Sequence, residues 1–242
     1  MVNVTARLTH TNKSYNKQPI LKDISIEVEQ GQILGLIGPS GSGKTTTIKC
    51  LLGMEKLDSG QADIFDQRIP NRQILSRIGY MGQTDALYTG LTAKENLTFF
   101  GKLSGLHGQA LTESIANNLE FVQLSSAINK TVSTFSGGMK RRLSLAIALL
   151  QDPDLIILDE PTVGIDPSLR QSIWQQLKSF AQEGKSIIVT THVMDEAERC
   201  DQVGLIIDGK LFALGSPNDL KQQFNAQTIE EVFLKAEEGE QQ

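Results

Sequence analysis

The feature that most constrains the fold is a glycine-rich turn, Gly38-Pro39-Ser40-Gly41-Ser42-Gly43, set between an apolar run and a helical run. The run before it, Ile33 to Ile37, is apolar without alternation, which is typical of a strand covered on both faces. The run after it, Lys44 to Leu52, has helical character and ends at Gly53. Strand, turn and helix in this order favour an α/β protein with a mainly parallel sheet.

Apolar patterns predict further strands and helices on both sides of this turn. Near the N-terminus, Ile24, Ile26 and Val28 alternate with polar residues, as in a half-buried strand. Asp208-Gly209 is a hairpin turn signal that joins two of the later strands. The later strands are expected at Leu155 to Leu158, Ile187 to Thr190, Val203 to Ile207 and Lys210 to Leu214, and helices at Pro167 to Gln182 and Met194 to Cys200.

The middle of the chain differs from both ends. Thr84 to Gln151 carries helical periodicity with little strand signal, which predicts an inserted helical subdomain. We therefore expect one domain, with residues 1–83 and 152–220 as its core, 84–151 as the helical part and 221–242 as a tail. The acidic end, Thr228 to Gln242, is expected to fray after Leu234.

Composition limits the functions that such a chain can have. Lys and Arg number 23 and Asp and Glu 28, so the net charge is −5, which disfavours general nucleic-acid binding. No apolar run approaches the ~18 residues of a membrane span, and the polar N-terminus is unlike a signal peptide. We expect a soluble intracellular protein. Two cysteines, Cys50 and Cys200, and three histidines argue against a disulfide framework or a structural zinc site.

The turn and its helix fit the pattern G-x-x-x-x-G-K-[ST], from Gly38 to Thr45. Glycines let backbone N–H groups wrap around a phosphate, and the helix adds the positive end of its dipole. Lys44 supplies a cation for the β- and γ-phosphates, and Thr45 offers a hydroxyl to Mg²⁺. The alternative is a glycine-rich turn without a ligand.

Polar residues follow three apolar segments, where ligands gather in parallel sheets. Asp159 would hold Mg²⁺ and Glu160 would act as general base towards water, unless Glu160 is only a solvated carboxylate. His192 follows another strand and can donate to the γ-phosphate, although a single histidine is usually structural. Gln83 follows Ile78 to Met81, and its amide oxygen can reach Mg²⁺ or the attacking water.

The segment Phe135-Ser136-Gly137-Gly138-Met139-Lys140-Arg141-Arg142-Leu143 resembles the signature segment of ATP-binding cassette (ABC) ATPases. Roughly residues 4 to 234 follow that family's order of motifs. The resemblance implies a P-loop NTPase (RecA-like) core with a mainly parallel sheet, an N-terminal antiparallel β part and an inserted α-helical subdomain. It also implies an ATPase that uses ATP and Mg²⁺.

The same resemblance implies roles for individual residues. Gln83 takes the place of the family's Q-loop glutamine, His192 that of the switch histidine, and Gly164-Ile165-Asp166 that of the D-loop. Tyr15 suits the aromatic residue that stacks on adenine; its alternative is an ordinary half-buried strand tyrosine. The expected nucleotide contacts are Tyr15, Gly38, Pro39, Ser40, Gly41, Ser42, Gly43, Lys44, Thr45, Thr46, Ser136, Gly137 and Gly138, and the expected Mg²⁺ ligands are Thr45, Gln83 and Asp159.

The signature segment predicts a helix that starts at Ser136 to Gly138 and runs to Leu150. Lys140, Arg141 and Arg142 in its first turns oppose the helix dipole, which is favourable only if an anion docks there. The resemblance implies that this anion is the γ-phosphate of ATP held by a second copy. The alternative is a solvated basic face, and we expect some of the three to be only that.

Departures from the commonest signature indicate a branch of the family. The signature begins with Phe135 rather than Leu and carries Met139 rather than Gln, and Gly82 stands where Pro is common. This pattern is similar to the drug- and antibiotic-exporter (ABC-2 type) branch, whose six-span permeases are separate chains. The ending Thr228 to Leu234 resembles that branch too.

That branch implies partners and a location. We expect a homodimer that powers an integral membrane permease exporting drugs, antibiotics or other amphiphiles, with no nucleic acid bound. The chain would be cytoplasmic and peripheral on the inner face of the membrane. A groove near Gln83 with Leu87, Tyr88 and Leu91 is the candidate dock for a permease helix, unless these residues are subdomain core.

Two other functions stay open at this point. A soluble ABC ATPase could serve DNA repair, translation or cluster assembly, but the net charge, the single cassette and the lack of a coiled-coil insertion argue against it. An unrelated P-loop kinase with a small-molecule acceptor would lack a signature segment.

Overall fold

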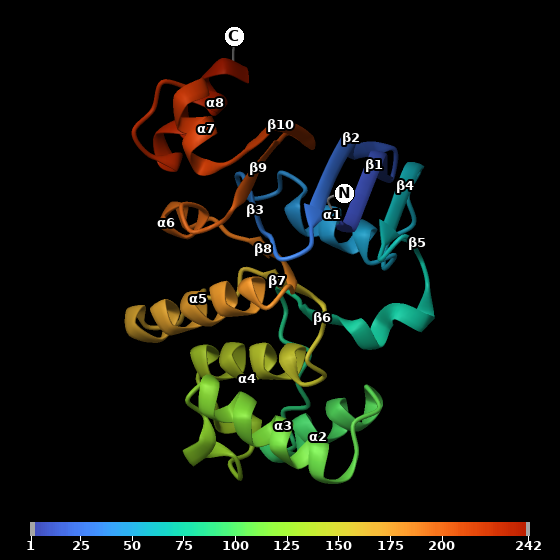
Figure 1. Cartoon of the computed structure of the whole chain (residues 1–242), viewed down its shortest axis with the longest axis vertical. Coiled ribbons are helices and arrows are strands. Elements are labelled where there is room, and N and C mark those ends of the chain that lie inside the picture. The colour runs from blue at the N-terminus through green and yellow to red at the C-terminus, as the bar shows by residue number, and fades with distance from the viewer. Residues whose placement is uncertain (1–2, 241–242) are drawn as a thin grey trace. The chain divides into compact units, whose positions relative to one another are not determined.

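The computed structural model describes residues 3–240, which form two compact units (Figure 1). Unit 1 contains the described residues up to Arg72 together with those from Ser186 onward, and unit 2 contains Gln73–Lys185. The boundaries between these units differ from the boundaries predicted from sequence. The predicted division into a core, a helical part and a tail stays a prediction.

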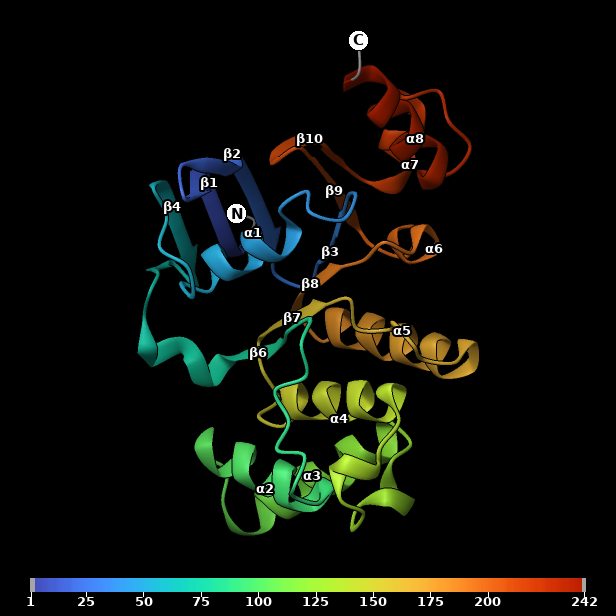
Figure 2. The same cartoon turned by 180° about the vertical axis from the view of Figure 1, so that it is seen from behind.

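Unit 1 opens with an antiparallel sheet whose strand order is β2 (Gln18–Glu29), β1 (Val4–Tyr15), β4 (Ser59–Ile64) and β5 (Gln67–Arg68). Figures 1 and 2 show β1, β2 and β4 as neighbours. In β2, Ile24, Ile26 and Val28 are at most 2% exposed, whereas Glu27 and Glu29 face solvent. The alternation predicted from sequence is confirmed, and it gives this sheet one core face.

A second, mostly parallel group of strands in unit 1 has the order β10 (Lys210–Gly215), β9 (Gln202–Ile207), β3 (Ile33–Ile37) and β8 (Ser186–Thr190). β3 runs parallel to both β8 and β9, and all its residues are buried. Asp208 and Gly209 have φ values of 46° and 77° and turn β9 into antiparallel β10, as predicted. α1 (Lys44–Leu51) follows the glycine-rich turn after β3.

One helix of unit 1 is shorter than predicted. α6 (Met194–Ala197) ends before Cys200 because the chain must reach the start of β3. There, Ile33 N–H donates to Asp201 Oδ2 over 2.8 Å, and Asp201 N–H donates to the Ile33 carbonyl over 2.9 Å. A tertiary contact therefore ends a helix that the local sequence would continue.

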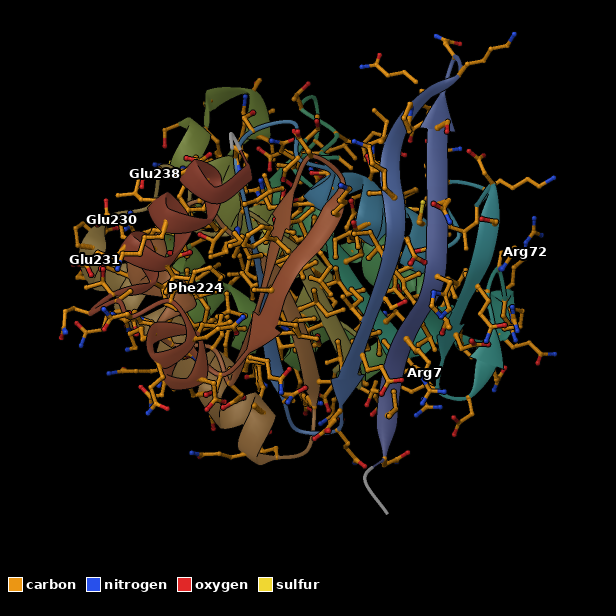
Figure 3. All side chains as sticks on the ribbon, turned by 90° about the horizontal axis from the view of Figure 1, so that it is seen from above. Arg7, Arg72, Phe224, Glu230, Glu231 and Glu238 are labelled. Atoms are coloured by element: carbon orange, nitrogen blue, oxygen red, sulfur yellow. The ribbon has the colours of Figure 1, made fainter. Side chains whose placement is uncertain are left out.

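The acidic end of the chain does not fray after Leu234 within the described residues. α7 (Pro217–Gln223) is followed by α8 (Ile229–Glu240). The inner side of α8 is fully buried at Ala236, and Lys235 Nζ donates to the carbonyls of Phe224 and Asn225 over 3.2 and 2.7 Å. Figure 3 shows Glu230, Glu231 and Glu238 on the outer side of α8, so the acidic composition reflects a solvated face.

Unit 2 holds two parallel strands, β6 (Ile78–Met81) and β7 (Leu155–Asp159), in register from Ile78↔Leu155 to Met81↔Leu158. α5 (Pro167–Gln182) has the bounds predicted from sequence. Its start is specified by Pro167 at the first position and by Asp166, whose Oδ1 accepts from the Leu169 N–H over 3.0 Å.

Three helices fill the rest of unit 2: α2 (Ala93–Leu103), α3 (Gly108–Phe121) and α4 (Gly137–Leu149). α4 packs against α2 and α3 and also against β6 and β7, so it links the helices of the unit to its strands. Short 3₁₀ turns lie at Arg72–Arg77, Ser125–Ala127 and Val132–Thr134. No helix of the described part of the chain is long and apolar enough to cross a membrane.

Candidate active site

The glycine-rich loop of unit 1 has a backbone that only glycine permits at two positions. Gly38 has a φ of 153° and Gly43 a φ of 108°. A Cβ at Gly43 would lie 2.8 Å from Leu21 Cδ2, and a Cβ at Gly38 would meet the carbonyl oxygen of Ile206. The loop therefore passes so close to β2 and β9 that only glycine fits at these two positions.

The Lys44 side chain folds back over this loop. Its Nζ donates to the carbonyls of Gly38 and Pro39 over 2.8 and 2.9 Å, and the residue is 7% exposed. Ser42 Oγ is buried and has no hydrogen-bond partner among the described residues. A fixed cation, an unmatched hydroxyl and the start of α1 fit a polyphosphate, whose oxygens accept from all three.

Two further predicted residues of unit 1 stand near strand ends. Tyr15 ends β1 and is 38% exposed, so one part of its ring is open to solvent. Burial, with a smaller contribution from the charge of Glu55, raises the pKa of its phenol, which stays neutral at physiological pH. His192 is exposed and follows β8. The preceding residue, Thr191, is tied to α6 because its Oγ1 donates to Glu196 Oε2 over 2.7 Å.

In unit 2, the predicted polar residues lie beyond the ends of the two paired strands. Asp159 is 1% exposed and is the last residue of β7. Glu160 follows with a φ of 53°, a left-handed backbone that is unusual for this residue type. Gln83 is exposed and follows β6 after Gly82. Parallel pairing therefore brings Gln83 and the two carboxylates to one edge of unit 2.

One residue at this edge was not recognised from sequence. The guanidinium of Arg141, on α4, is buried and donates to the carbonyls of Gly82, Gln83, Asp159 and Glu160. Arg141 Nη1 also lies 3.5 Å from Asp85 Oδ1, to which Ser144 donates over 2.9 Å. Arg141 thus joins the segments after β6 and β7 to α4.

The prediction that all three basic residues of α4 serve an anion or solvent is therefore wrong for Arg141. Arg142 is also engaged, because its Nη1 donates to the carbonyls of Val122 and Gln123 over 3.3 and 3.4 Å. The signal that could have found Arg141 is its spacing: Leu145 and Leu149 follow at intervals of four on the buried face of α4.

The signature segment and the Gly164–Asp166 segment meet within unit 2. Ser136 caps α4, its exposed Oγ accepting from the Met139 N–H over 3.2 Å. A Cβ at Gly138 would lie 2.6 Å from the Gly164 carbonyl oxygen, so only glycine permits this approach. Hydrogen bonds, first from the Leu169 N–H and then from Ser168, lower the pKa of the Asp166 carboxyl.

Comparison with known proteins now decides the family. The sequence profile of the family described as "ABC transporter" matches residues 21–163. This chain belongs to the ABC transporter family. The resemblance inferred from the signature segment is confirmed, and the unrelated P-loop kinase is excluded.

Relatives and solved structures agree with this membership. The cassette is 42% identical over 231 residues to "Nod factor export ATP-binding protein I" of Sinorhizobium fredii, covering 94% of this chain and 67% of that protein. The protein of the same name from Bradyrhizobium diazoefficiens is 39% identical over 96% of this chain and 77% of its own length. A solved "ATP binding subunit of ABC transporter" is similar with a TM-score of 0.89 and 27% identity, covering 96% of this chain and 99% of that one.

A second solved structure bears on the activity. The ABC cassette MJ0796, described as a dimer in a post-hydrolysis state bound to ADP and Pi, has a TM-score of 0.81 and 25% identity, covering 87% of this chain and 98% of that one. The cassette fold, ATP binding and ATPase activity predicted from sequence are thereby confirmed. The phosphate loop, Tyr15 and His192 belong to unit 1, and the other predicted site residues belong to unit 2. The role of each of these residues therefore stays a prediction.

Two of the three departures of this ABC cassette from the commonest family pattern, Phe135 and Gly82, have local explanations. Phe135 is 6% exposed, so it fills an apolar position just as the usual leucine would. Gly82 supplies its carbonyl to Arg141 over 2.7 Å, an interaction that a proline at this position would also allow because it uses no N–H. Neither departure removes a polar group from the site.

Proposed function

We propose that this cassette powers the export of an amphiphilic cargo through a separate membrane permease. The observation that carries the proposal is the 42% identity, over 94% of this chain, to a protein named for the export of Nod factor. The same naming among relatives supports the transporter over a soluble ABC ATPase of DNA repair, translation or cluster assembly. Drugs, antibiotics or other amphiphiles are the proposed cargo class, on the resemblance of the signature segment.

Two copies would enclose two ATP molecules. Each composite site would take the phosphate loop, including Lys44 and Thr46, from one copy and Ser136, Gly137 and Gly138 from the other. Ser136 supports this arrangement because it is exposed at the start of α4, where the helix dipole favours an anion. ATP binding would close the dimer and hydrolysis would release it.

Within each composite site, Glu160 would act as general base towards water, with His192 near the γ-phosphate and Gln83 near the metal and the water. The support for Glu160 is its fixed backbone: the left-handed conformation and the bonds from Arg141 Nε and Nη2 to its carbonyl, 3.1 and 2.7 Å, hold it in place. Thr45, Asp159 and Gln83 would hold Mg²⁺. When bound, the ion would supply positive charge that neutralises the phosphate oxygens.

The permease would dock beside the segment after β6. Tyr88 is 50% exposed, Phe99 is 42% exposed and Leu103 is 73% exposed. The Tyr88 and Phe99 rings lie 5.0 Å apart, and Phe100 lies 5.2 Å from Phe99. The exposed aromatic rings suit the apolar face of an amphipathic helix, whereas Leu87 and Leu91 are half-buried. The cassette would then lie on the cytoplasmic side of the membrane.

The test is affinity capture of the Glu160→Gln variant from membranes of the native cells, with ATP and a mild detergent. We expect one integral membrane protein in stoichiometric amount, and a Tyr88→Ala/Phe99→Ala form of the same variant should lose it. Recovery from the cytosol alone, with soluble or nucleic-acid partners, would overturn the transport proposal and leave the ATPase standing.

A further inference from the structure

Lys13 and Tyr15 form a close contact on β1. They are two residues apart at the end of the strand, where its pairing with β2 is irregular. Lys13 Nζ lies 4.8 Å from the centroid of the Tyr15 ring, within the range of a cation–π contact. The Lys13 side chain is only 11% exposed, whereas Tyr15 is 38% exposed. The ammonium is therefore buried against a ring that remains partly open.

The position of this ammonium is fixed by two oxygen partners. Lys13 Nζ lies 3.3 Å from Glu55 Oε2 and donates to the Lys56 carbonyl over 2.9 Å. A lysine is rarely buried unless it is paired, and here the pairing comes from the segment that follows α1. Glu55 is thus the carboxylate partner of the Lys13 ammonium beside the ring.

Glu55 also lies near Tyr15, because its charge adds to the larger effect of burial in raising the pKa of the phenol. Lys13 therefore stands over the ring face, and Glu55 is a neighbour of both residues.

We propose that Lys13 and Glu55 are positioning residues that hold the Tyr15 ring as the platform for the adenine base. This inference rests on the proposed role of Tyr15. Because the ammonium stands over one face of the ring, the base stacks on the other face. Neither Lys13 nor Glu55 belongs to the phosphate loop, so we expect their effect to depend on the base and not on the triphosphate.

The experiment compares two ligands of the purified chain, ATP and inorganic tripolyphosphate, which has no base. Lys13→Met keeps the length of the side chain and removes its charge. It should weaken ATP affinity roughly three- to tenfold and leave tripolyphosphate affinity unchanged, while kcat at saturating ATP stays the same. Lys13→Arg should retain most of the affinity. Lys56→Met is the matched control, because it removes an exposed charge next to the site and keeps the carbonyl that Lys13 uses.

Lys13→Met in a Tyr15→Leu background separates the role of Tyr15 as adenine platform from the positioning role of Lys13. Tyr15→Leu alone should lower the affinity for ATP but not for tripolyphosphate. Adding Lys13→Met should then cause no further loss of ATP affinity. An unchanged ATP affinity in Tyr15→Leu would overturn the adenine platform itself. Two results would overturn only the positioning role, provided that Tyr15→Leu weakens ATP binding as expected. One is an unchanged ATP affinity in Lys13→Met, and the other is an equal loss of ATP and tripolyphosphate affinity in that variant. If Lys13→Met does not fold, Glu55→Gln decides by the same comparison.

Discussion

At the scale of single residues, the catalytic proposal depends most on Glu160. Glu160→Gln should keep ATP binding and slow hydrolysis by roughly 10²–10⁴, because an amide cannot accept a proton from the attacking water. Turnover and nucleotide affinity are measured on the same preparation. Glu120→Gln, at an exposed position of α3, is the control and should be normal. Near-normal turnover of Glu160→Gln would remove Glu160 from the role of general base.

Cys50 allows a prediction about pH. Burial, ahead of nearby charges, raises the pKa of its thiol from 9.0 to about 11. The unfolded chain therefore ionises this thiol first, and the contribution of Cys50 to stability is complete below pH 9 and lost as pH rises towards 11. Urea unfolding at a series of pH values should show a steeper alkaline loss for the native chain than for Cys50→Ala. Parallel curves would contradict the shift.

At the scale of elements, α4 is joined to its surroundings by the Arg141 guanidinium. Arg141→Met removes a buried guanidinium that donates to four backbone carbonyls, so the free energy of unfolding should fall by about 2–4 kcal/mol. Lys140→Met, one residue earlier on the same helix, should change it by less than about 0.5 kcal/mol. Urea denaturation measures both. Equal effects of the two variants would show that Arg141 carries no special share of the stability.

The elements also show where local sequence is sufficient. The bounds of α5 follow from Asp166 and Pro167, which cap and start the helix, and the strands follow from alternation or continuous apolar runs. α6 and α8 were mispredicted because a contact with β3 ends one and the packing of Ala236 extends the other. Such contacts join residues far apart in sequence, which periodicity does not register.

The same limit applies to the site. The phosphate loop and the two carboxylates could be recognised because their chemistry needs contiguous residues. Arg141 and Lys13 were not recognised, because their partners lie 18 or more residues away along the chain: Asp159 for Arg141 and Glu55 for Lys13. The leucine spacing after Arg141 places it on the buried face of α4, but that spacing does not identify the partners.

At the scale of the whole molecule, the composite sites predict complementation between inactive copies. Lys44→Ala should abolish binding or turnover through the phosphate loop. Gly137→Asp should abolish turnover through the signature; the new side chain fits, since nothing lies within 4 Å of a Cβ there. Mixing the two should restore up to about a quarter of the activity, because half of the dimers are mixed and each has one intact site. No recovery on mixing would contradict sites shared between copies.

The resting position of Lys44 has a consequence for the thermodynamics of nucleotide exchange. Its ammonium already has two carbonyl acceptors on the loop, so an arriving phosphate replaces these oxygens and does not meet an unsatisfied cation. The enthalpy gained at Lys44 is then the difference between charged and neutral acceptors. Exchange of one oxygen acceptor for another at Lys44 buries no apolar surface, so a heat-capacity change on ATP binding would come from the closure of two copies.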